Sequence, residues 1–287
     1  MQSFAGTMLI LKNRQELSDF VRTIKGKNLT LGFVPTMGAL HEGHLALIKR
    51  SIEENQYTVC SIFVNPTQFN DASDLEKYPR TEEADMEKLR AEGCDAVYFP
   101  RVEDLYPNGL ENDPIDLGGI DQVMEGAFRS GHFAGVATVV SRLFMQVQPT
   151  RAYFGEKDFQ QIQVIRKMVK EKKLPVEIVP VPIVRAENGL ALSSRNTRLT
   201  PDFKEKSTFL YQTLLAAKSL AAKLPSKEIV KQIEKMYAES DLKLEYFIIA
   251  GEDTLQTADV FEPQKHYRAF VAAYAGSVRL IDNLRIL

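Results

Sequence analysis

The chain has few cysteines and no long hydrophobic run, and each shortage excludes a class of protein. Cys60 and Cys94 are its 2 cysteines, and both lie in or beside apolar segments, where a free thiol behaves as a small hydrophobic group. A disulfide scaffold and a cysteine-based zinc site are therefore not expected. No run approaches the roughly 18 apolar residues of a membrane-spanning helix, so we do not expect a membrane protein either.

An excess of positive charge is also lacking. The formal net charge is -2, from 36 basic and 38 acidic residues, whereas a general nucleic-acid or membrane-surface binder would carry a basic excess. The first basic side chain, Lys12, follows the apolar stretch at the start of the sequence, which is the reverse of a secretory signal. We therefore expect a soluble, cytoplasmic protein with neither nucleic acid nor membrane as a partner.

The first two-thirds of the chain alternate strand-like apolar runs with helix-length segments. The expected strands start near Leu29, Tyr57, Asp95, Ala152 and Val176, and the expected helices cover 43–55, the stretch between Thr81 and Gly93, and 136–147. This alternation predicts an α/β domain, with a parallel sheet covered by helices on both faces in the doubly wound, Rossmann-like class. The strand order does not follow from the pattern.

The pattern changes after about Val184. The expected elements are then a tight turn at 188–189, a long helix opened by Thr200 and Pro201 and reaching about Lys223, a second helix after Ser226, and two strand-like runs at 245–253 and 267–284. Helices followed by antiparallel strands predict a small α+β unit. We therefore predict a catalytic domain at 1–184 and a C-terminal lid domain at 185–287.

Two common phosphate-binding motifs are missing, since there is neither a GxxxxGK[ST] loop nor a GxGxxG fingerprint. The segment PTMGALHEGH at 35–44 instead follows a predicted strand and leads into a helix, whose N-terminus favours an anion. Gly38 and Gly43 permit close backbone approach. His41 and His44 can face one phosphate and donate hydrogen bonds to a leaving oxygen. The alternatives are structural histidines or a zinc site, although the spacing is one residue short of HExxH.

Two further polar segments can bind phosphates. Lys157, in the segment GEKD at 155–158, follows a predicted strand and carries a mobile charge suited to phosphate. Asp158 can cap a helix, bind a ribose or help to hold a metal, and an ordinary capping turn is the alternative. The segment LSSRN at 192–196 combines two hydroxyls with Arg195, which suits the terminal phosphates of a triphosphate; a polar loop is the alternative.

Neutral amides form a third group of candidates. Asn65 and Gln68 follow the second predicted strand, and Gln161 lies on the helix after GEKD. Amides can orient a carboxylate and hydroxyls without neutralising a carboxylate that must act as a nucleophile. The alternative is an Asn-Pro turn and a surface glutamine.

Taken together, these segments resemble the pantothenate synthetase (pantoate–β-alanine ligase) family of the HxGH nucleotidyltransferase superfamily. The matching blocks are PTMGALHEGH at 35–44, VNPTQF at 64–69, YPRT at 78–81, EGAFRSGHFAGVATVV at 125–140, YFGEKDFQQ at 153–161 and LALSSRN at 190–196. They cover roughly the first 200 residues in family order. Leu192 replaces a usual Met and Phe159 a common Tyr, and neither change removes a polar catalytic group.

The resemblance implies that ATP and (R)-pantoate give pantoyl adenylate and pyrophosphate, after which β-alanine displaces AMP to give pantothenate, a precursor of coenzyme A. It also implies a homodimer, and Mg²⁺ bound mainly through the ATP phosphates with no dedicated protein site. The implied catalytic residues are His41, His44 and Lys157. The implied ATP contacts are Met37, Gly38, Ala39, Leu40, His41, Glu42, Gly43, His44, Gly155, Glu156, Lys157, Asp158, Val184, Leu192, Ser193, Ser194 and Arg195, and the implied pantoate and β-alanine contacts are Gln68, Gln161 and Asn65.

Two other functions stay open on the sequence. A related nucleotidyltransferase that acts on a phosphorylated acceptor should offer Lys or Arg to the acceptor, where this chain offers amides. A non-catalytic nucleotide-sensing module could keep the glycines but would not need His41, His44 and Lys157 together. No role is assigned to His132, although its neighbours match the family block.

Overall fold

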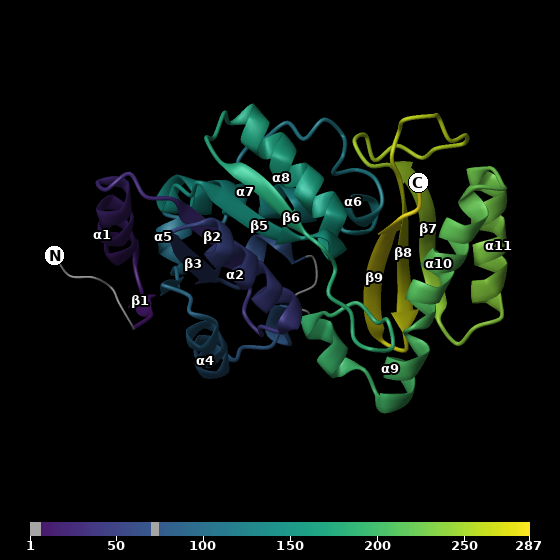
Figure 1. The fold of residues 1–287 in the computed structure, drawn as a ribbon, viewed down its shortest axis with the longest axis horizontal. Helices are drawn as coiled ribbons and strands as arrows, with labels where there is room; N and C mark the ends of the chain where they lie inside the picture. The colour runs from purple at the N-terminus through teal and green to yellow at the C-terminus, as the bar shows by residue number, and fades with distance from the viewer. Residues whose placement is uncertain (1–6, 70–74) are drawn as a thin grey trace. The chain divides into compact units, whose positions relative to one another are not determined.

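The computed structural model describes residues 7–69 and 75–287, and the chain divides into two compact units (Figure 1). The first unit comprises Met1–Glu156 and Gln161–Pro182, and the second comprises Lys157–Gln160 and Ile183–Leu287. The segment Lys157–Gln160 therefore groups with the second unit, although the chain on both sides of it groups with the first.

A parallel sheet forms the centre of the first unit. Its strands are β1 (Leu9–Leu11), β2 (Leu31–Thr36), β3 (Tyr57–Ile62), β4 (Ala96–Tyr98), β5 (Arg151–Gly155) and β6 (Glu177–Val181), in the order β1-β4-β3-β2-β5-β6. All pairings are parallel, which confirms the predicted α/β class. The sequence pattern missed β1, because three apolar residues show no alternation.

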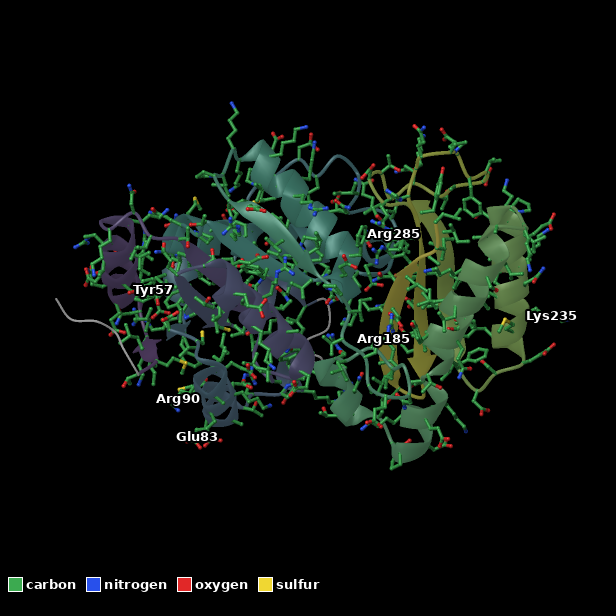
Figure 2. The ribbon with its side chains drawn as sticks, viewed as in Figure 1. Tyr57, Glu83, Arg90, Arg185, Lys235 and Arg285 are labelled. Atoms are coloured by element: carbon green, nitrogen blue, oxygen red, sulfur yellow. The ribbon has the colours of Figure 1, made fainter. Side chains whose placement is uncertain are left out.

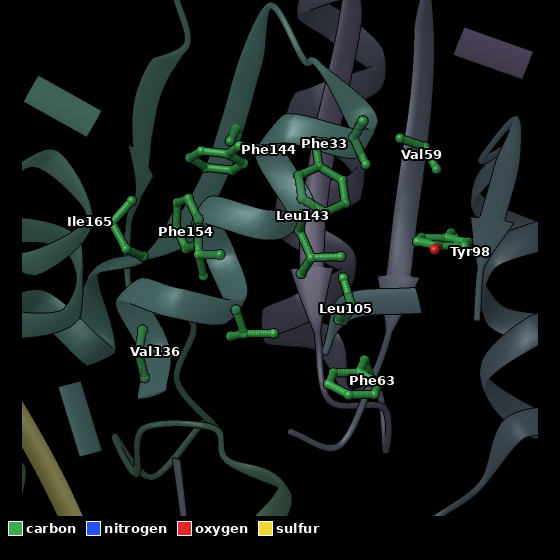
Figure 3. Packing of buried hydrophobic residues seen from close by; sticks show 14 of the residues in the cluster. Phe33, Val59, Phe63, Tyr98, Leu105, Val136, Leu143, Phe144, Phe154 and Ile165 are labelled. Atoms are coloured by element: carbon green, nitrogen blue, oxygen red, sulfur yellow. The ribbon is translucent and has the colours of Figure 1, made fainter. Parts of the chain in front are cut away.

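Helices cover both faces of this sheet. They are α1 (Arg14–Lys25), α2 (Glu42–Glu54), α4 (Glu82–Glu92), α5 (Val102–Leu105), α6 (Glu125–Phe128), α7 (His132–Val147) and α8 (Phe159–Glu171). One core joins the sheet to α1, α7 and α8, and a second joins it to α2 and α4. Figure 3 shows the first core, where Phe33 of β2 and Phe154 of β5 flank Phe144 of α7. Burial of these faces supplies the main driving force for folding.

The order of the strands creates a switch point between β2 and β5. From β2 the chain crosses through α2 to β3 on one side, whereas from β5 it crosses through α8 to β6 on the other. Phe33 of β2 pairs with Ala152 of β5, so the carboxyl ends of the two strands lie side by side. Ligands of open α/β sheets bind at such a point.

The second unit is an antiparallel sheet covered by helices. Its elements are the short helix η3 (Ser194–Arg198), α9 (Pro201–Lys206), α10 (Phe209–Ala221), α11 (Ser226–Ala238), β7 (Lys243–Gly251), β8 (Tyr267–Ala275) and β9 (Val278–Arg285), with the strands in that order. Leu214 of α10 and Ile233 of α11 pack with Val271 of β8 in a fully buried core. The unit is α+β.

Two predicted elements of the second unit were wrong in detail. The single helix expected up to about Lys223 is two helices, because Ser207 ends α9: its amide and hydroxyl both donate to the carbonyl of Phe203, at 2.9 and 2.6 Å. The last strand-like run is two strands, because Gly276 turns the chain in the left-handed region, with φ of 60°. Apolar residues on both sides of the turn hide it in the sequence.

Candidate functional site

His41 and His44 form a reciprocal cap at the start of α2. The Gly43 N–H donates to His41 Nδ1 at 3.1 Å, and the His41 N–H donates to His44 Nδ1 at 3.3 Å. The ring centroids are 4.1 Å apart. Because each Nδ1 accepts a backbone hydrogen bond, each neutral ring carries its proton on Nε2. The pair therefore presents two Nε2–H donors beside the amides of a helix N-terminus, where an anion is favoured.

Asn65 and Gln68 lie on a tight turn, η1 (Pro66–Gln68), after β3. Asn65 is only 1% exposed; its Oδ1 accepts from the Tyr106 hydroxyl at 2.7 Å, and its Nδ2 donates to Gln68 Oε1 at 3.3 Å. Gln68 Nε2 lies 2.8 Å from Met37 Sδ, so the amide group is next to the 35–44 segment. Asn65 thus orients Gln68, which is the more exposed of the two side chains.

His132, whose role the sequence left open, holds this turn. Arg129 Nη1 lies 3.1 Å from His132 Nε2 and can only donate, so Nε2 accepts. His132 Nδ1 then carries the proton and donates to the Gln68 carbonyl at 2.8 Å. The motif GHFAGVATVV therefore has a structural explanation, because its first helical residue fixes the main chain of Gln68.

The GEKD segment lies at the switch point. Gly155 ends β5, and a short helix η2 (Glu156–Asp158) leads into α8. Lys157 is half-buried, with its ammonium 3.1 Å from Asp158 Oδ1. In the second unit, Asn283 of β9 donates from Nδ2 to the Lys157 carbonyl at 2.9 Å. The main chain of Lys157 is therefore fixed by a buried side chain 126 residues later, which no local sequence pattern could indicate.

A network of buried charges holds Asn283. Arg268 donates to Asn283 Oδ1 at 2.6 Å and to Glu252 at 2.8 Å, and its guanidinium stacks on Phe159 at 4.1 Å. Burial raises the pKa of Glu252, but the hydrogen bond from Arg285 and the charges of both arginines outweigh it, so the pKa is lowered. Because Arg268 must donate to Oδ1, the orientation of the Asn283 amide is fixed, with its NH₂ toward Lys157.

The loop before η3 is anchored by Arg185, which lies beside β9 in Figure 2. Arg185 makes a two-pronged pair with Asp282, at 2.6 and 2.9 Å, and stacks on Tyr211 at 3.9 Å. Burial raises the pKa of Asp282 despite this pair. The Leu192 N–H donates to the Val184 carbonyl at 3.0 Å, and Ser193 caps η3 by accepting from the Arg195 N–H at 3.3 Å. Leu192 and Ser193 therefore lead directly into η3, which Ser194 and Arg195 begin.

Asp85 was not among the sequence candidates. It lies on α4, is fully buried, and accepts hydrogen bonds from the Ala39 and Leu40 amides, both at 2.8 Å. The sequence does contain a signal. Asp85 stands one helical turn before the buried Leu89, at a position where a core-facing residue is expected.

The cysteines and acidic groups do not suggest other chemistry. Both thiols are buried, and burial raises the pKa of Cys94 to about 12, which removes nucleophilic character. Across residues 7–69 and 75–287, no three or more His, Cys, Asp or Glu side chains cluster so as to hold a metal ion. In the same ranges, no helix has the length and apolar character that crossing a membrane requires.

The structure thus brings part of the predicted site together. Within the first unit, three predicted segments lie at or after the carboxyl ends of neighbouring strands: 37–44 after β2, the turn at 65–68 after β3, and Gly155 and Glu156 at the end of β5. Gln161 also belongs to this unit and lies near the start of α8. Lys157, Asp158, Val184 and the segment 192–195 belong to the second unit.

Known proteins give an independent comparison. The family model for pantoate-β-alanine ligase matches residues 9–285. Pantothenate synthetase of Flavobacterium psychrophilum is 45% identical over 281 residues, which cover 97% of this chain and 100% of that protein. Pantothenate synthetase of Bacteroides fragilis is 46% identical over 279 residues, which cover 97% and 99%.

Solved structures agree in fold over the same length. The crystal structure of pantothenate synthetase from Thermus thermophilus gives a TM-score of 0.90 at 42% identity, covering 97% of this chain and 99% of that one. Pantoate-β-alanine ligase from Francisella tularensis, complexed with β-γ ATP and β-alanine, gives 0.81 at 36% identity, covering 98% of each chain. By sequence and fold over nearly its whole length, the chain belongs to the pantoate-β-alanine ligase family.

Proposed function

We propose that this protein is a ligase that condenses (R)-pantoate with β-alanine to pantothenate through a pantoyl adenylate, with consumption of ATP. The observation that carries the proposal is the histidine pair at the switch point, whose capping bonds leave both ring protons on Nε2, in a segment that also contacts the amide of Gln68. The family match over residues 9–285 and the nucleotide and β-alanine in the Francisella tularensis complex support it.

In the first step, a carboxylate oxygen of pantoate attacks the α-phosphorus of ATP in line with the departing pyrophosphate. Both reactants are anions, so the approach is unfavourable without compensating positive charge. We assign that compensation to the Nε2–H groups of His41 and His44 and to the cations Lys157 and Arg195. Removing one such donor commonly lowers the rate by ~10²–10³. The 37–44 segment, 155–158, Val184 and 192–195 form the proposed ATP contacts.

Mg²⁺ fits this site as part of the substrate. The groups assigned to the phosphate charge, on His41, His44, Lys157 and Arg195, are ring N–H groups, an ammonium and a guanidinium, which donate hydrogen bonds and do not coordinate a metal. Mg²⁺ prefers oxygen ligands, and the phosphates of ATP supply them. We therefore propose that the ion enters bound to ATP, where it neutralises charge on the phosphates, and that the protein provides no dedicated metal site.

Pantoate is the proposed ligand of Gln68 and Gln161. An amide can bind a carboxylate and hydroxyls without neutralising the attacking oxygen, as an arginine would. Asn65 contributes indirectly, because its Nδ2 donates to Gln68 Oε1 and limits how that side chain turns. Holding the acid in place makes the encounter with ATP effectively unimolecular, which can supply a large part of the rate enhancement.

In the second step, the β-alanine amine attacks the acyl carbon of the adenylate. A carbon–nitrogen bond forms, the bond from that carbon to the AMP oxygen breaks, and the amine loses a proton. Gln68 is the residue proposed to contact this amino acid as well. The adenylate hydrolyses readily, so we propose that the second unit acts as a lid that excludes water. We also propose a cytoplasmic homodimer, as the resemblance to the family implies.

Exchange of labelled pyrophosphate into ATP tests the proposal. We expect exchange that requires pantoate and does not require β-alanine. Exchange only with a phosphorylated acceptor would support a different nucleotidyltransferase, and no exchange with any acid would support a nucleotide sensor.

His44→Ala and Lys157→Ala test the assigned roles in the same assay. Each variant should lose at least about tenfold in exchange, since each removes a donor to the departing pyrophosphate. Circular dichroism should show that both retain the fold. Wild-type exchange rates in both variants would refute the assignment.

A further inference from the structure

The loop that carries the two histidines adopts an unusual backbone. Gly38 has φ of 83° and Ala39 has φ of 50°, both in the left-handed region. Glycine adopts this region freely, but alanine does so only at a cost in energy. Another part of the protein must therefore hold Ala39 in this conformation, two residues before the cap of α2.

Asp85 supplies that restraint. Its Oδ2 accepts from the Ala39 N–H and its Oδ1 from the Leu40 N–H, both at 2.8 Å, so both carboxylate oxygens are used on consecutive amides. The side chain is 0% exposed. A Cβ on Gly38 would lie 3.2 Å from Asp85 Oδ2 and 3.1 Å from Ile62, so the glycine also makes room for the carboxylate.

A second residue of α4 binds the same loop, but as a hydrogen-bond donor instead of an acceptor. Lys88, three residues after Asp85, donates from Nζ to the Leu40 carbonyl at 2.5 Å. The helix thus contacts the amides of Ala39 and Leu40 with an acceptor and the carbonyl of Leu40 with a donor. One helix, α4, therefore binds both the N–H and the carbonyl group of Leu40.

Leu40 is followed directly by His41, so this restraint reaches the histidine pair. His41 accepts from Gly43, and His44 accepts from the His41 amide, which makes the ring positions depend on the main chain at 40–41. A buried carboxylate is unfavourable next to a site for an anion unless it is needed for position, because it repels the phosphates. Both carboxylate oxygens of Asp85 accept hydrogen bonds from loop amides, and this positional role explains why a buried carboxylate is found there.

We propose that Asp85 is a positioning residue for adenylate formation, which fixes the loop 39–40 so that His41 and His44 meet the ATP phosphates. The inference rests on the proposed function and adds to it a residue that does not touch substrate. Asp85 acts on ATP through the loop, because both hydrogen bonds of its carboxylate go to amides of that loop and not to Gln68 or Gln161.

Asp85→Asn is the first test. The amide keeps the shape of the side chain but offers one acceptor, and its NH₂ faces a backbone N–H, so one loop hydrogen bond is lost. The KM for ATP in pantoate-dependent exchange should rise about tenfold, the effect of one charge-assisted hydrogen bond. The KM for pantoate should stay within about twofold, a split that general destabilisation would not produce.

Glu83→Gln is the matched control, since it makes the same chemical change at an exposed position in the first turn of the same helix (Figure 2). It should leave both KM values unchanged. Lys88→Met changes an exposed residue, so the fold should survive even if Asp85→Asn fails to fold, and it should raise the KM for ATP in the same direction.

The outcomes separate this inference from the proposed function. Absence of pantoate-dependent exchange in the wild type would overturn the function. Exchange in the wild type, with an ATP KM unchanged in both Asp85→Asn and Lys88→Met, would overturn the role of Asp85 alone. Equal increases in the KM values for ATP and pantoate would also overturn it, because they would indicate a general structural effect.

Discussion

At the scale of single residues, Gly135 shows how the site depends on an absent side chain. A Cβ at this position of α7 would lie 2.5 Å from the Thr67 carbonyl oxygen and 2.9 Å from the Gln68 amide nitrogen. These are backbone atoms, which cannot move aside as a flexible side chain would. The close approach lets the Gly135 carbonyl accept from Asn65 Nδ2 at 3.3 Å. Gly135 therefore positions the turn that carries Gln68.

Gly135→Ala should consequently displace the turn. We expect a loss of about 1–3 kcal/mol in the free energy of unfolding, typical of overpacking. The KM for pantoate should rise several-fold while the KM for ATP stays near the wild-type value. Thermal unfolding and steady-state kinetics check both effects, and a variant with unchanged pantoate kinetics would show that the turn does not bind this substrate.

The sequence indicated which residues are candidates for the site better than it indicated the contacts that these residues make. Spacing and context were sufficient to select His41 and His44, since both lie where a predicted strand leads into a predicted helix. The tautomer of each ring was not predictable, because it depends on which backbone amide lies at each Nδ1. Asp85 was overlooked for a different reason. An acidic residue in the first turn of a helix is commonly explained by the helix dipole, which conceals a buried role.

At the scale of elements, the sequence correctly predicted helix ends where a capping residue marks them. Thr200 accepts from the Phe203 amide at 3.3 Å with Pro201 in the first turn, as predicted, and Gly93 ends α4 in the left-handed region. The break at Ser207 was missed because serine is tolerated within helices, and only the three-dimensional structure shows its hydroxyl bound to the Phe203 carbonyl.

Strand β9 fixes the main chain of Lys157 through Asn283, and this contribution can be tested directly. Asn283→Asp replaces the NH₂ that faces the Lys157 carbonyl with an oxygen, while the other oxygen can still accept from Arg268. The folded state should persist, but repulsion should displace Lys157. We expect about a tenfold loss in pyrophosphate exchange, comparable to losing one charge-assisted contact.

A double-mutant cycle isolates this effect. If Asn283 acts through Lys157, then adding Asn283→Asp to Lys157→Ala should cause little further loss. Asn108→Asp, the same change at an exposed site, is the control and should be silent. Additive losses in the double variant would show that Asn283 affects the enzyme by another route.

At the scale of the whole molecule, the sequence predicted the α/β class and the family, because several motifs occur in family order over roughly the first 200 residues. It could not predict the strand order β1-β4-β3-β2-β5-β6, which determines that the loops after β2, β3 and β5 meet at one edge. It also could not predict that Lys157–Gln160 would group with the second unit, since that depends on contacts with β8 and β9.

The central claim is that the carboxylate of pantoate attacks the α-phosphorus of ATP, and transfer of oxygen-18 from that carboxylate measures it most directly. Cleavage of the adenylate by β-alanine leaves one carboxylate oxygen on the phosphate. We predict AMP that carries one oxygen-18 atom, together with unlabelled pyrophosphate. Unlabelled AMP, or ADP formed with labelled inorganic phosphate, would contradict the account.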